Sequence, residues 1–391
     1  MKILYELQLS SISKVHPGKI MLDSDSNFTF ALNLLKELKN YADISILVPL
    51  PSQLEAGEKS IETLKKYNLN PYEIKFIPHP AESRFFVSIE DYKQVLADVS
   101  PDVIFCNDPA HVANWKQLCK DDTKIVTYNH WICFLEYPKN RVPYFFRQIE
   151  GEYLADLVFC NSSAMVSALM RQTRFIPNMN YSKFKILYPS VDEETIMQYQ
   201  EEKFEKNLIL FNHRLSTQEE YMENFQNFMC IIGDVKNACP RLKVLFTNPS
   251  GYKVKGLESW MTCKTLSREE YVSILASKPL TCAFFGYERM WSMSLGEANG
   301  FGSVSVVPRH SCFLEMYPEN YKYFFRPDNL DEAKEKLIFL LKHPNVRLKE
   351  GEKLKKFVLS KFSNKVLAKK TYITLKNLWR KNNGNRGRNN N

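Results

Sequence analysis

The sequence lacks the features that would place the chain in several specialised classes. No run of eighteen or more apolar residues occurs, so no membrane-spanning helix is expected. The first residues, Met1 to Leu7, meet an acidic residue too early for a signal peptide, so we expect the protein in the cytoplasm. The nine cysteines are scattered and never spaced as Cys-x-x-Cys, which indicates reduced thiols and neither a zinc site nor a disulfide framework.

The composition is that of a globular chain with an uneven charge. With 391 residues, 44% of them hydrophobic and 13% aromatic, the chain is long enough for two domains with separate cores. Residues 349–391 hold thirteen Lys and Arg but only two acidic residues. The net charge of this segment is therefore +11, whereas that of the whole chain is +9. This segment suggests an anionic partner such as nucleic acid or a phospholipid surface; the other interpretation is a solvated helix face with a disordered tail.

Apolar strands and amphipathic helices alternate through the first half, which is the pattern of a doubly wound α/β domain. The predicted strands are residues 2–7, 44–48, 74–77, 103–106, 125–128, 157–160 and 185–188, and the predicted helices are 26–38, 61–67, 89–99 and the segment ending at 170. Ser26 and Asn27 are suited to cap the first of these helices.

The second half repeats this alternation after a charged linker at residues 193–206. Its predicted strands are 208–211, 242–247 and 281–285, and its predicted helices are 219–238, 268–276 and 330–342. We therefore predict two tandem Rossmann-like doubly wound domains, 1–195 and 196–345, followed by a basic helical segment at 346–381 and a disordered tail at 382–391.

One stretch of the second half, residues 287–308, has the outline of a nucleotide site. It reads as a loop, a short helix opened by acidic residues, a glycine stop at Gly300 and Gly302, and a buried valine-rich strand. This is the βαβ arrangement that places phosphate and ribose at a helix N-terminus. An ordinary crossover without a ligand is the alternative.

Polar residues follow the predicted strands in both halves, at the edge where parallel sheets bind ligands. Two such halves imply a cleft between the domains, in which each domain binds one of the two substrates. In this arrangement the chain resembles glycosyltransferases of the GT-B fold, in the broad retaining group, through short motifs across residues 100–345. Its second half is also similar in motif layout to phage DNA α-glucosyltransferases.

The resemblance gives the first domain one catalytic candidate. Tyr128-Asn129-His130, after a strand, resembles the histidine loop that faces the transferred sugar and the acceptor. This implies that His130 hydrogen-bonds a sugar hydroxyl or helps to orient the acceptor. A structural histidine is the other interpretation.

In the second domain, residues Leu210 to Leu215 resemble a motif of this family in which an arginine follows a strand and binds the donor diphosphate. Arg214 suits this role, because a guanidinium can bridge two phosphate oxygens and neutralise the charge of a leaving group. The family usually adds a lysine about five residues later, but Glu219 and Glu220 occupy that region. Either another base replaces the lysine, with Lys19 and Arg289 as candidates, or the chain binds a nucleotide-like ligand without turnover.

Glu297-Ala298, with Gly302 five residues after Glu297, matches the family's Glu-Ala helix and the glycine before a buried strand. The resemblance implies that the Glu297 carboxylate accepts hydrogen bonds from both ribose hydroxyls, that Ala298 and Arg289 border the donor, and that Glu288 stands for the family's first glutamate, one residue out of register.

Two motifs near the N-terminus match less well. Gly18 and Lys19 are assigned to the donor phosphates in place of the family's glycine-rich loop. Asp23-Ser24-Asp25 has the form of a metal-binding DxD motif, but it precedes a helix, where capping is the better explanation. No metal ligand is therefore assigned.

The implied reaction is transfer of a sugar from a nucleoside-diphosphate sugar to a hydroxyl, without an obligatory metal, and with catalytic roles for His130, Arg214 and Glu297. The predicted acceptor side holds aromatic residues that alternate with basic ones, namely Trp131, Phe134, Tyr137, Lys139, Arg141, Tyr144, Phe145, Phe146 and Arg147. Of these, we assign Trp131, Phe134, Arg141 and Arg147 to the acceptor.

Three interpretations of the function remain open, two of which differ in the acceptor. A hydroxymethylated base in DNA fits the mixture of aromatic and basic residues, because a flipped base stacks on rings while cations hold phosphates. A peripheral membrane contact that presents a lipid-linked or envelope glycan fits it as well. A non-catalytic relative that binds nucleotides or nucleic acid is the third, and it follows from the missing lysine.

Overall fold

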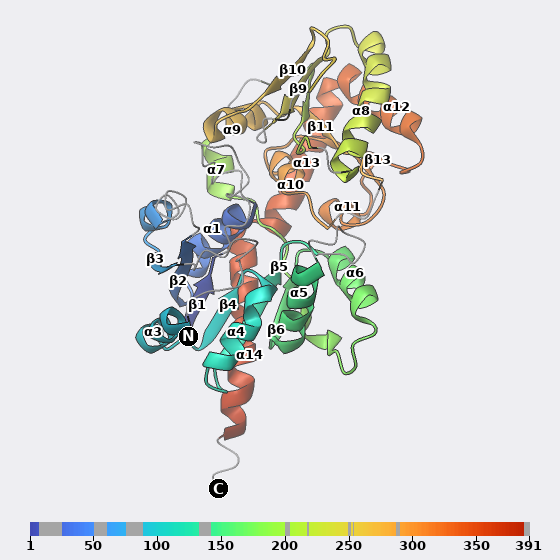
Figure 1. The fold of residues 1–391 in the computed structure, drawn as a ribbon. Coiled ribbons are helices and arrows are strands. Elements are labelled where there is room, and N and C mark those ends of the chain that lie inside the picture. Colours follow the sequence, from blue (N-terminus) through green and yellow to red (C-terminus); the bar gives the residue numbers. More distant parts are fainter. Residues whose placement is uncertain are drawn as a thin grey trace. The chain divides into compact units, whose positions relative to one another are not determined.

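The computed structural model divides the chain into two compact units, each described here by itself. Unit 1 comprises Met1–Tyr188 and Asn364–Asn391, and unit 2 comprises Pro189–Ser363. The residues that the structure describes are 1–7, 26–50, 61–75, 89–132, 142–199, 204–216, 219–248, 252, 254–286 and 290–386. Figure 1 shows their elements in sequence colours.

Unit 1 contains a sheet whose described strands all run parallel, in the order β3-β2-β1-β4-β5-β6-β7. The strands are β1 (Lys2–Glu6), β2 (Asp43–Leu50), β3 (Asn70–Lys75), β4 (Val103–Cys106), β5 (Lys124–Asn129), β6 (Leu157–Cys160) and β7 (Phe184–Ile186). Strands β4, β5 and β6 are buried along their whole length, because helices cover both faces of a doubly wound sheet.

The helices of unit 1 come from both ends of the chain. They are α1 (Ser26–Leu38), α3 (Ile89–Val99), the short 3-10 helix η4 (Pro109–His111), α4 (Val112–Leu118), α5 (Val142–Leu154), α6 (Ser163–Thr173), the 3-10 helix η6 (Tyr181–Lys183) and α14 (Asn364–Arg386). Residues 61–66 are also helical. Helix α14 packs against α1, so the end of the chain helps to cover the first sheet (Figure 1).

A buried carboxylate at the end of β1 ties three elements together. Glu6 Oε1 accepts a hydrogen bond from the Tyr92 hydroxyl at 2.7 Å and lies 2.9 Å from His111 Nδ1, and Oε2 accepts one from Trp115 Nε1 at 2.7 Å. Burial would raise the pKa of Glu6, but the His111 ring and these hydrogen bonds outweigh burial, and the pKa is lowered. The ionised carboxylate thus anchors α3, η4 and α4 to the sheet.

Unit 2 is built on the same plan. Its described strands are parallel, in the order β10-β9-β8-β11-β12-β13. They are β8 (Leu208–Phe211), β9 (Lys243–Thr247), β10 (Met261–Lys264), β11 (Leu280–Cys282), β12 (Ser305–Pro308) and β13 (Phe324–Phe325). The helices are α7 (Glu193–Gln198), α8 (Glu219–Ala238), α9 (Arg268–Ala276), α10 (Met293–Gly300), α11 (Phe313–Met316), α12 (Leu330–Lys342) and α13 (Pro344–Phe362).

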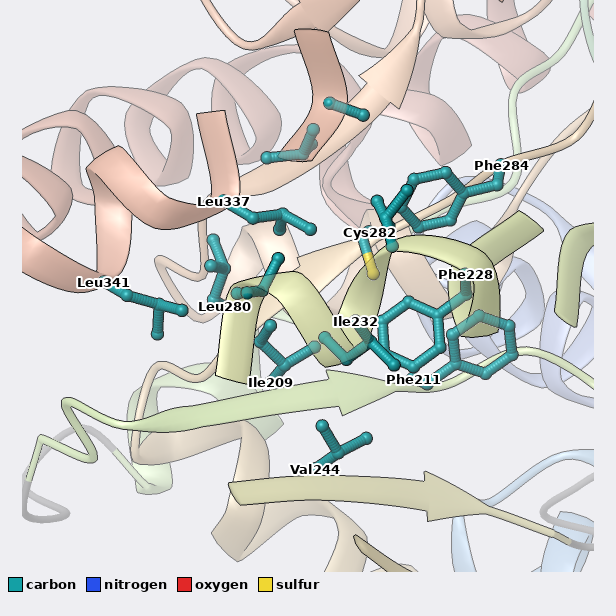
Figure 2. Packing of buried hydrophobic residues seen from close by; sticks show 14 of the residues in the cluster. Ile209, Phe211, Phe228, Ile232, Val244, Leu280, Cys282, Phe284, Leu337 and Leu341 are labelled. Atoms are coloured by element: carbon teal, nitrogen blue, oxygen red, sulfur yellow. The ribbon is translucent and has the colours of Figure 1, made fainter. Parts of the chain in front are cut away.

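The core of unit 2 joins the sheet to α8 and α12. Figure 2 shows Phe228 and Ile232 of α8 beside Ile209 and Phe211 of β8, with Leu337 of α12 near by. All five side chains are fully or almost fully buried. Burial of side chains of this size contributes roughly 1.5–3 kcal/mol each, so this cluster holds the sheet edge on which the candidate site depends.

The predicted fold class, two Rossmann-like α/β domains in tandem, is confirmed by these two parallel sheets with interleaved helices. Helices α1, α3, α8, α9 and α12 begin and end at the predicted residues. Their apolar residues recur at helical spacing, which is the local signal that the prediction used.

Other elements differ from the prediction. Helices α4 and α5 and strand β10 were not predicted, and α7 lies within the predicted linker. The basic segment is not one helix, since Ser363 separates α13 from α14, and α14 continues to Arg386, beyond the predicted end. None of the helices in the described parts of the chain is both long and apolar enough to cross a membrane.

Helix α13 approaches the turn after α10 very closely. Gly302, with φ +93°, ends this turn, and a Cβ atom placed on Gly351 of α13 would lie 2.0 Å from the Gly302 carbonyl oxygen. Only a glycine at position 351 therefore allows α13 to pack against the segment that carries α10.

We predict that Gly351→Ala lowers the free energy of unfolding by about 1–3 kcal/mol, because the added methyl group forces two backbones apart. Gly233→Ala is the matched control, since Gly233 is also helical but has nothing within 4 Å of its Cβ position. This control should gain up to about 1 kcal/mol from better helix propensity. Chemical denaturation of both variants checks the prediction, and equal stabilities would contradict it.

Candidate active site

In unit 1 the predicted histidine follows β5 at the carboxyl edge of the sheet. His130 Nε2 lies 2.7 Å from the Ser26 hydroxyl, at the first residue of α1. Its carbonyl accepts a hydrogen bond from Asn161 Nδ2 at 3.0 Å, from the end of β6. The residue is partly exposed, whereas ring atom Nδ1 is buried. His130 is therefore held between α1 and the neighbouring strand ends.

The next residue, Trp131, is fixed by α5. Its ring stacks on Tyr144 with centroids 4.9 Å apart and planes at 4°. Gln148 Nε2 donates to the Trp131 carbonyl and to Asn129 Oδ1, each at 3.0 Å. The Tyr144 hydroxyl in turn donates to Asp108 Oδ1 at 3.0 Å. The end of β5 thus has a defined backbone path and a partly exposed aromatic ring.

Helix α5 changes the interpretation of the aromatic and basic stretch. Tyr144 and Phe145 are buried in a small core with Ile149, so these two rings are not available to stack on a base. Arg147 faces solvent and pairs with Glu150 one turn on, at 3.0 Å, which is an ordinary exposed helix pair. The sequence did not reveal this because the period of the stretch was not recognised as helical.

A second buried carboxyl group lies on α5. Glu152 is fully buried, and neither of its carboxyl oxygens makes a hydrogen bond to any residue that the structure describes. Burial raises the pKa of Glu152 to about 8, although Asn129 and Lys183 oppose the shift. Glu152 is therefore mainly protonated at neutral pH, close to the strand end that carries His130.

In unit 2 the predicted ribose ligand lies on α10. The helix begins at Met293 and has no acidic residue in its first turn, so the expected acidic opening is wrong, and Glu297 belongs to the second turn. Hydrogen bonds of Asn299 fix this helix to the sheet. Asn299 Nδ2 donates to the Tyr317 hydroxyl at 2.9 Å, and the Ser305 hydroxyl of β12 donates to Asn299 Oδ1 at 2.6 Å. Glu297 consequently stands on a helix with a fixed position.

The Glu297 carboxylate forms a bidentate ion pair with Arg268 of α9. Arg268 Nη1 donates to Oε2 at 3.1 Å, and Nη2 donates to Oε1. Both side chains are partly exposed, 29% for Arg268 and 21% for Glu297. Sequence reasoning missed Arg268, because a pair 29 residues apart leaves no local pattern.

The end of β8 lies beside this pair. Asn212 Nδ2 donates to the Tyr271 hydroxyl at 3.1 Å and to the Ser294 carbonyl at 2.9 Å, which links β8 to α9 and α10. Burial and the charge of Glu297 raise the pKa of Tyr271, so its phenol stays neutral. Asn212 is 5% exposed, and its buried Oδ1 has no hydrogen-bond partner among the residues that the structure describes.

The next two residues differ in role, because His213 is structural and Arg214 is accessible to a ligand. His213 is buried, and its Nε2 lies 2.8 Å from the Cys282 carbonyl, which ties β8 to β11. Arg214 is exposed, and its guanidinium carbon lies 5.6 Å from the centre of the Tyr221 ring. The cation predicted to hold phosphate is thus at the carboxyl edge of the sheet and accessible.

One predicted donor residue is placed where it cannot meet a ligand with its side chain. Ala298 is fully buried, and its carbonyl accepts the Ser303 amide at 3.0 Å, so it packs α10 against the strand that follows. The other predicted residues lie outside the described parts of the chain, namely Gly18, Lys19, Phe134, Arg141, Glu288 and Arg289. Asp23-Ser24-Asp25 also lies outside them.

The placed candidates fall into two sets. His130, Trp131 and Arg147 belong to unit 1, whereas Arg214, Glu297 and Ala298 belong to unit 2. Within unit 2 the structure gathers Glu297, Arg268, Tyr271 and Asn212 at one sheet edge. In the described residues, no group of three or more His, Cys, Asp or Glu side chains is arranged to hold a metal ion.

Comparisons with known proteins identify this architecture. Residues 28–195 match the model of Glycosyltransferase Family 4. The Anabaena protein Alr3699/HepE, solved in complex with UDP-glucose, has a TM-score of 0.69 and 13% identity, with 96% of this chain and 100% of that chain covered. No curated protein sequence gives a significant match.

Two further solved structures have the same fold. Sucrose-phosphate synthase from Thermosynechococcus elongatus has a TM-score of 0.68 and 10% identity, and S. aureus TarM, a mutant solved with Fondaparinux, alpha-GlcNAc-glycerol and UDP, has 0.66 and 10%. Each comparison covers 97% of this chain and 99% of the other.

The chain therefore has the GT-B glycosyltransferase fold. The match to the Glycosyltransferase Family 4 model covers residues 28–195, most of which lie in unit 1. The predicted resemblance to GT-B glycosyltransferases is confirmed, whereas the closer likeness to phage DNA α-glucosyltransferases stays a prediction.

Glu152 gives a pH prediction. Its pKa in the folded protein is above the unfolded value of roughly 4.3, so folded protein binds the extra proton and loses stability as pH rises from about 5 to 8, by about 1.4 kcal/mol per pH unit. Glu152→Gln carries no charge at any pH and should lack this decline. The exposed helix neighbour Glu150→Gln is the control and should retain it. Chemical denaturation across this pH range checks the difference, and parallel curves for wild type and Glu152→Gln would contradict it.

Proposed function

We propose that the protein transfers a sugar from a nucleoside-diphosphate sugar to an acceptor hydroxyl. The observation that carries this proposal is Glu297, a partly exposed carboxylate on a fixed helix at the carboxyl edge of the second sheet. A carboxylate there can accept hydrogen bonds from both hydroxyls of a ribose, which an edge made only of backbone amides cannot do. The complexes of HepE with UDP-glucose and with UDP support a nucleotide sugar as the donor.

Arg214 is the residue that we assign to the donor diphosphate. Its guanidinium is exposed at the end of β8, on the same sheet edge as Asn212 and Glu297. A guanidinium can bridge two phosphate oxygens, and its charge opposes the negative charge that grows on the departing diphosphate. Because that stabilisation is larger in the transition state than in the bound donor, Arg214 contributes to rate and not only to affinity.

We propose a retaining reaction, in line with the resemblance stated for the sequence. His130 is the candidate contact to the transferred sugar or the acceptor, since this partly exposed residue follows β5 at the carboxyl edge of the sheet, where Ser26 and Asn161 hold it in place. A hydrogen bond from a held imidazole orients a hydroxyl at little entropic cost.

For the acceptor we propose a carbohydrate hydroxyl. Two proteins of the same fold support this class: TarM was solved with alpha-GlcNAc-glycerol, and the other is a sucrose-phosphate synthase. The partly exposed Trp131 ring, stacked on Tyr144, suits a sugar because pyranose faces are apolar and pack on aromatic rings.

Hydroxymethylated DNA is the second candidate acceptor, and α14 is the observation that favours it. This helix has no acidic residue, and Lys365, Lys369, Lys370 and Arg380 are exposed along it. Such a cationic face attracts phosphates, with an affinity that falls steeply as salt is added.

One assay tests the donor and the acceptor together. The protein is incubated with UDP-, ADP-, GDP- and CDP-sugars, each alone, with oligosaccharides, and with duplex DNA that carries hydroxymethylcytosine, and release of nucleoside diphosphate is measured. We expect release with one nucleotide sugar, accelerated by an oligosaccharide. Acceleration by the DNA alone would replace the first acceptor with the second.

We predict that Arg214→Gln lowers kcat/KM for this release by about 100–1000-fold, the loss expected when one donor that stabilises the charge of a transition state is removed. Arg326→Gln is the matched control, because Arg326 is 70% exposed and pairs with Glu332 in the same unit. Its activity should equal that of the wild type. Wild-type rates in Arg214→Gln would overturn its assigned role, and no release with any donor would favour a protein that only binds nucleotides.

A further inference from the structure

Arg268 lies next to Glu297, the proposed ligand of the ribose, and belongs to no motif of the sequence. We propose that Arg268 is a positioning residue for the donor: it orients the Glu297 carboxylate so that both oxygens accept the two hydroxyls of a ribose. The inference rests on the proposed function, since it concerns the same donor site. It is carried by the two-pronged contact between the two side chains.

Both members of the pair are anchored before any ligand binds. Arg268 is the first residue of α9, where Ser267 and Glu270 form a capping box that fixes the start of the helix. Glu297 stands on α10, which the hydrogen bonds of Asn299 tie to Tyr317 and to Ser305 of β12. Because neither helix end is loose, the pair fixes the plane of the carboxylate as well as its position.

The hydrogen-bonding capacity of a carboxylate allows both partners at once. Its two oxygens offer about four acceptor sites, and a two-pronged arginine occupies one on each oxygen. One site on each oxygen therefore remains for a neighbouring pair of hydroxyls. With 21% of the Glu297 side chain exposed, a ligand can reach those sites without separating the ion pair.

Charge favours the same assignment. A partly buried carboxylate loses hydration, and a hydrogen-bonded guanidinium compensates for that loss better than a neutral partner. Tyr271, the neighbouring phenol, remains neutral because burial raises its pKa. Arg268 thus supplies a positive charge that offsets the lost hydration of the Glu297 carboxylate.

The test compares ribonucleotides with 2′-deoxyribonucleotides. Calorimetric titrations of UDP, ADP, GDP and CDP, and of their 2′-deoxy counterparts, find the nucleotide that the wild type binds and its preference for ribose. We expect Arg268→Gln to bind that ribonucleotide about tenfold more weakly, with a preference for ribose that falls to within about twofold. Arg268→Lys keeps the positive charge but cannot form the bidentate contact. It should therefore recover only part of the affinity and part of the preference for ribose.

A double variant separates action through Glu297 from a contact made by Arg268 itself. Glu297→Gln should show the same loss of ribose preference, and Glu297→Gln with Arg268→Gln should be no weaker than Glu297→Gln alone. Arg326→Gln is again the control, and circular dichroism confirms that each variant is folded.

Three outcomes in the variants would overturn the inference while the proposed function stands. An unchanged ribose preference in folded Arg268→Gln would show that Arg268 does not act on the diol. Tighter binding in that variant would show that the arginine competes with ribose for the carboxylate. Additive losses in the double variant would assign Arg268 a contact of its own. Absence of nucleotide binding by the wild type would instead overturn the proposed function, and the inference with it.

Discussion

Burial of both faces of each parallel sheet is the constraint on which the rest of the structure depends. Strands covered on both sides must be apolar, so polar side chains are confined to the strand ends or to fully bonded networks. Glu6 shows the second case, because three hydrogen-bonding side chains surround it at the end of β1. His130 and Asn212 show the first, since each follows a strand directly, and Arg214 lies two residues after Asn212. The candidate site is therefore a consequence of the sheet architecture.

Much of the fold could be predicted from local pattern, and the misses have physical reasons. Helices α3 and α12 were predicted with the bounds that the structure shows, because their apolar residues repeat at helical spacing. Helix α5 was missed because several of its aromatic residues look like a binding surface, yet Tyr144 and Phe145 pack into a core. Strand β10 is short, and its side chains alternate between buried and accessible, which leaves a weak apolar signal.

For the site, the sequence indicated single residues but not their partners. Glu297 and Arg214 follow recognisable elements and are placed at the expected sheet edge. Arg268, by contrast, reaches Glu297 only through the packing of α9 beside α10, and Asn212 links three elements by its side chain alone. Such contacts depend on how helices sit on a sheet, which no spacing of residues encodes.

The central claim is that Glu297, held by Arg268, binds the ribose of a nucleotide donor. The most direct measurement is a crystal structure of the wild type with the ribonucleoside diphosphate that it binds. We predict that both ribose hydroxyls lie within hydrogen-bonding distance of the Glu297 carboxyl oxygens, with the contacts to Arg268 intact. A nucleotide whose ribose lies away from Glu297 would contradict the account.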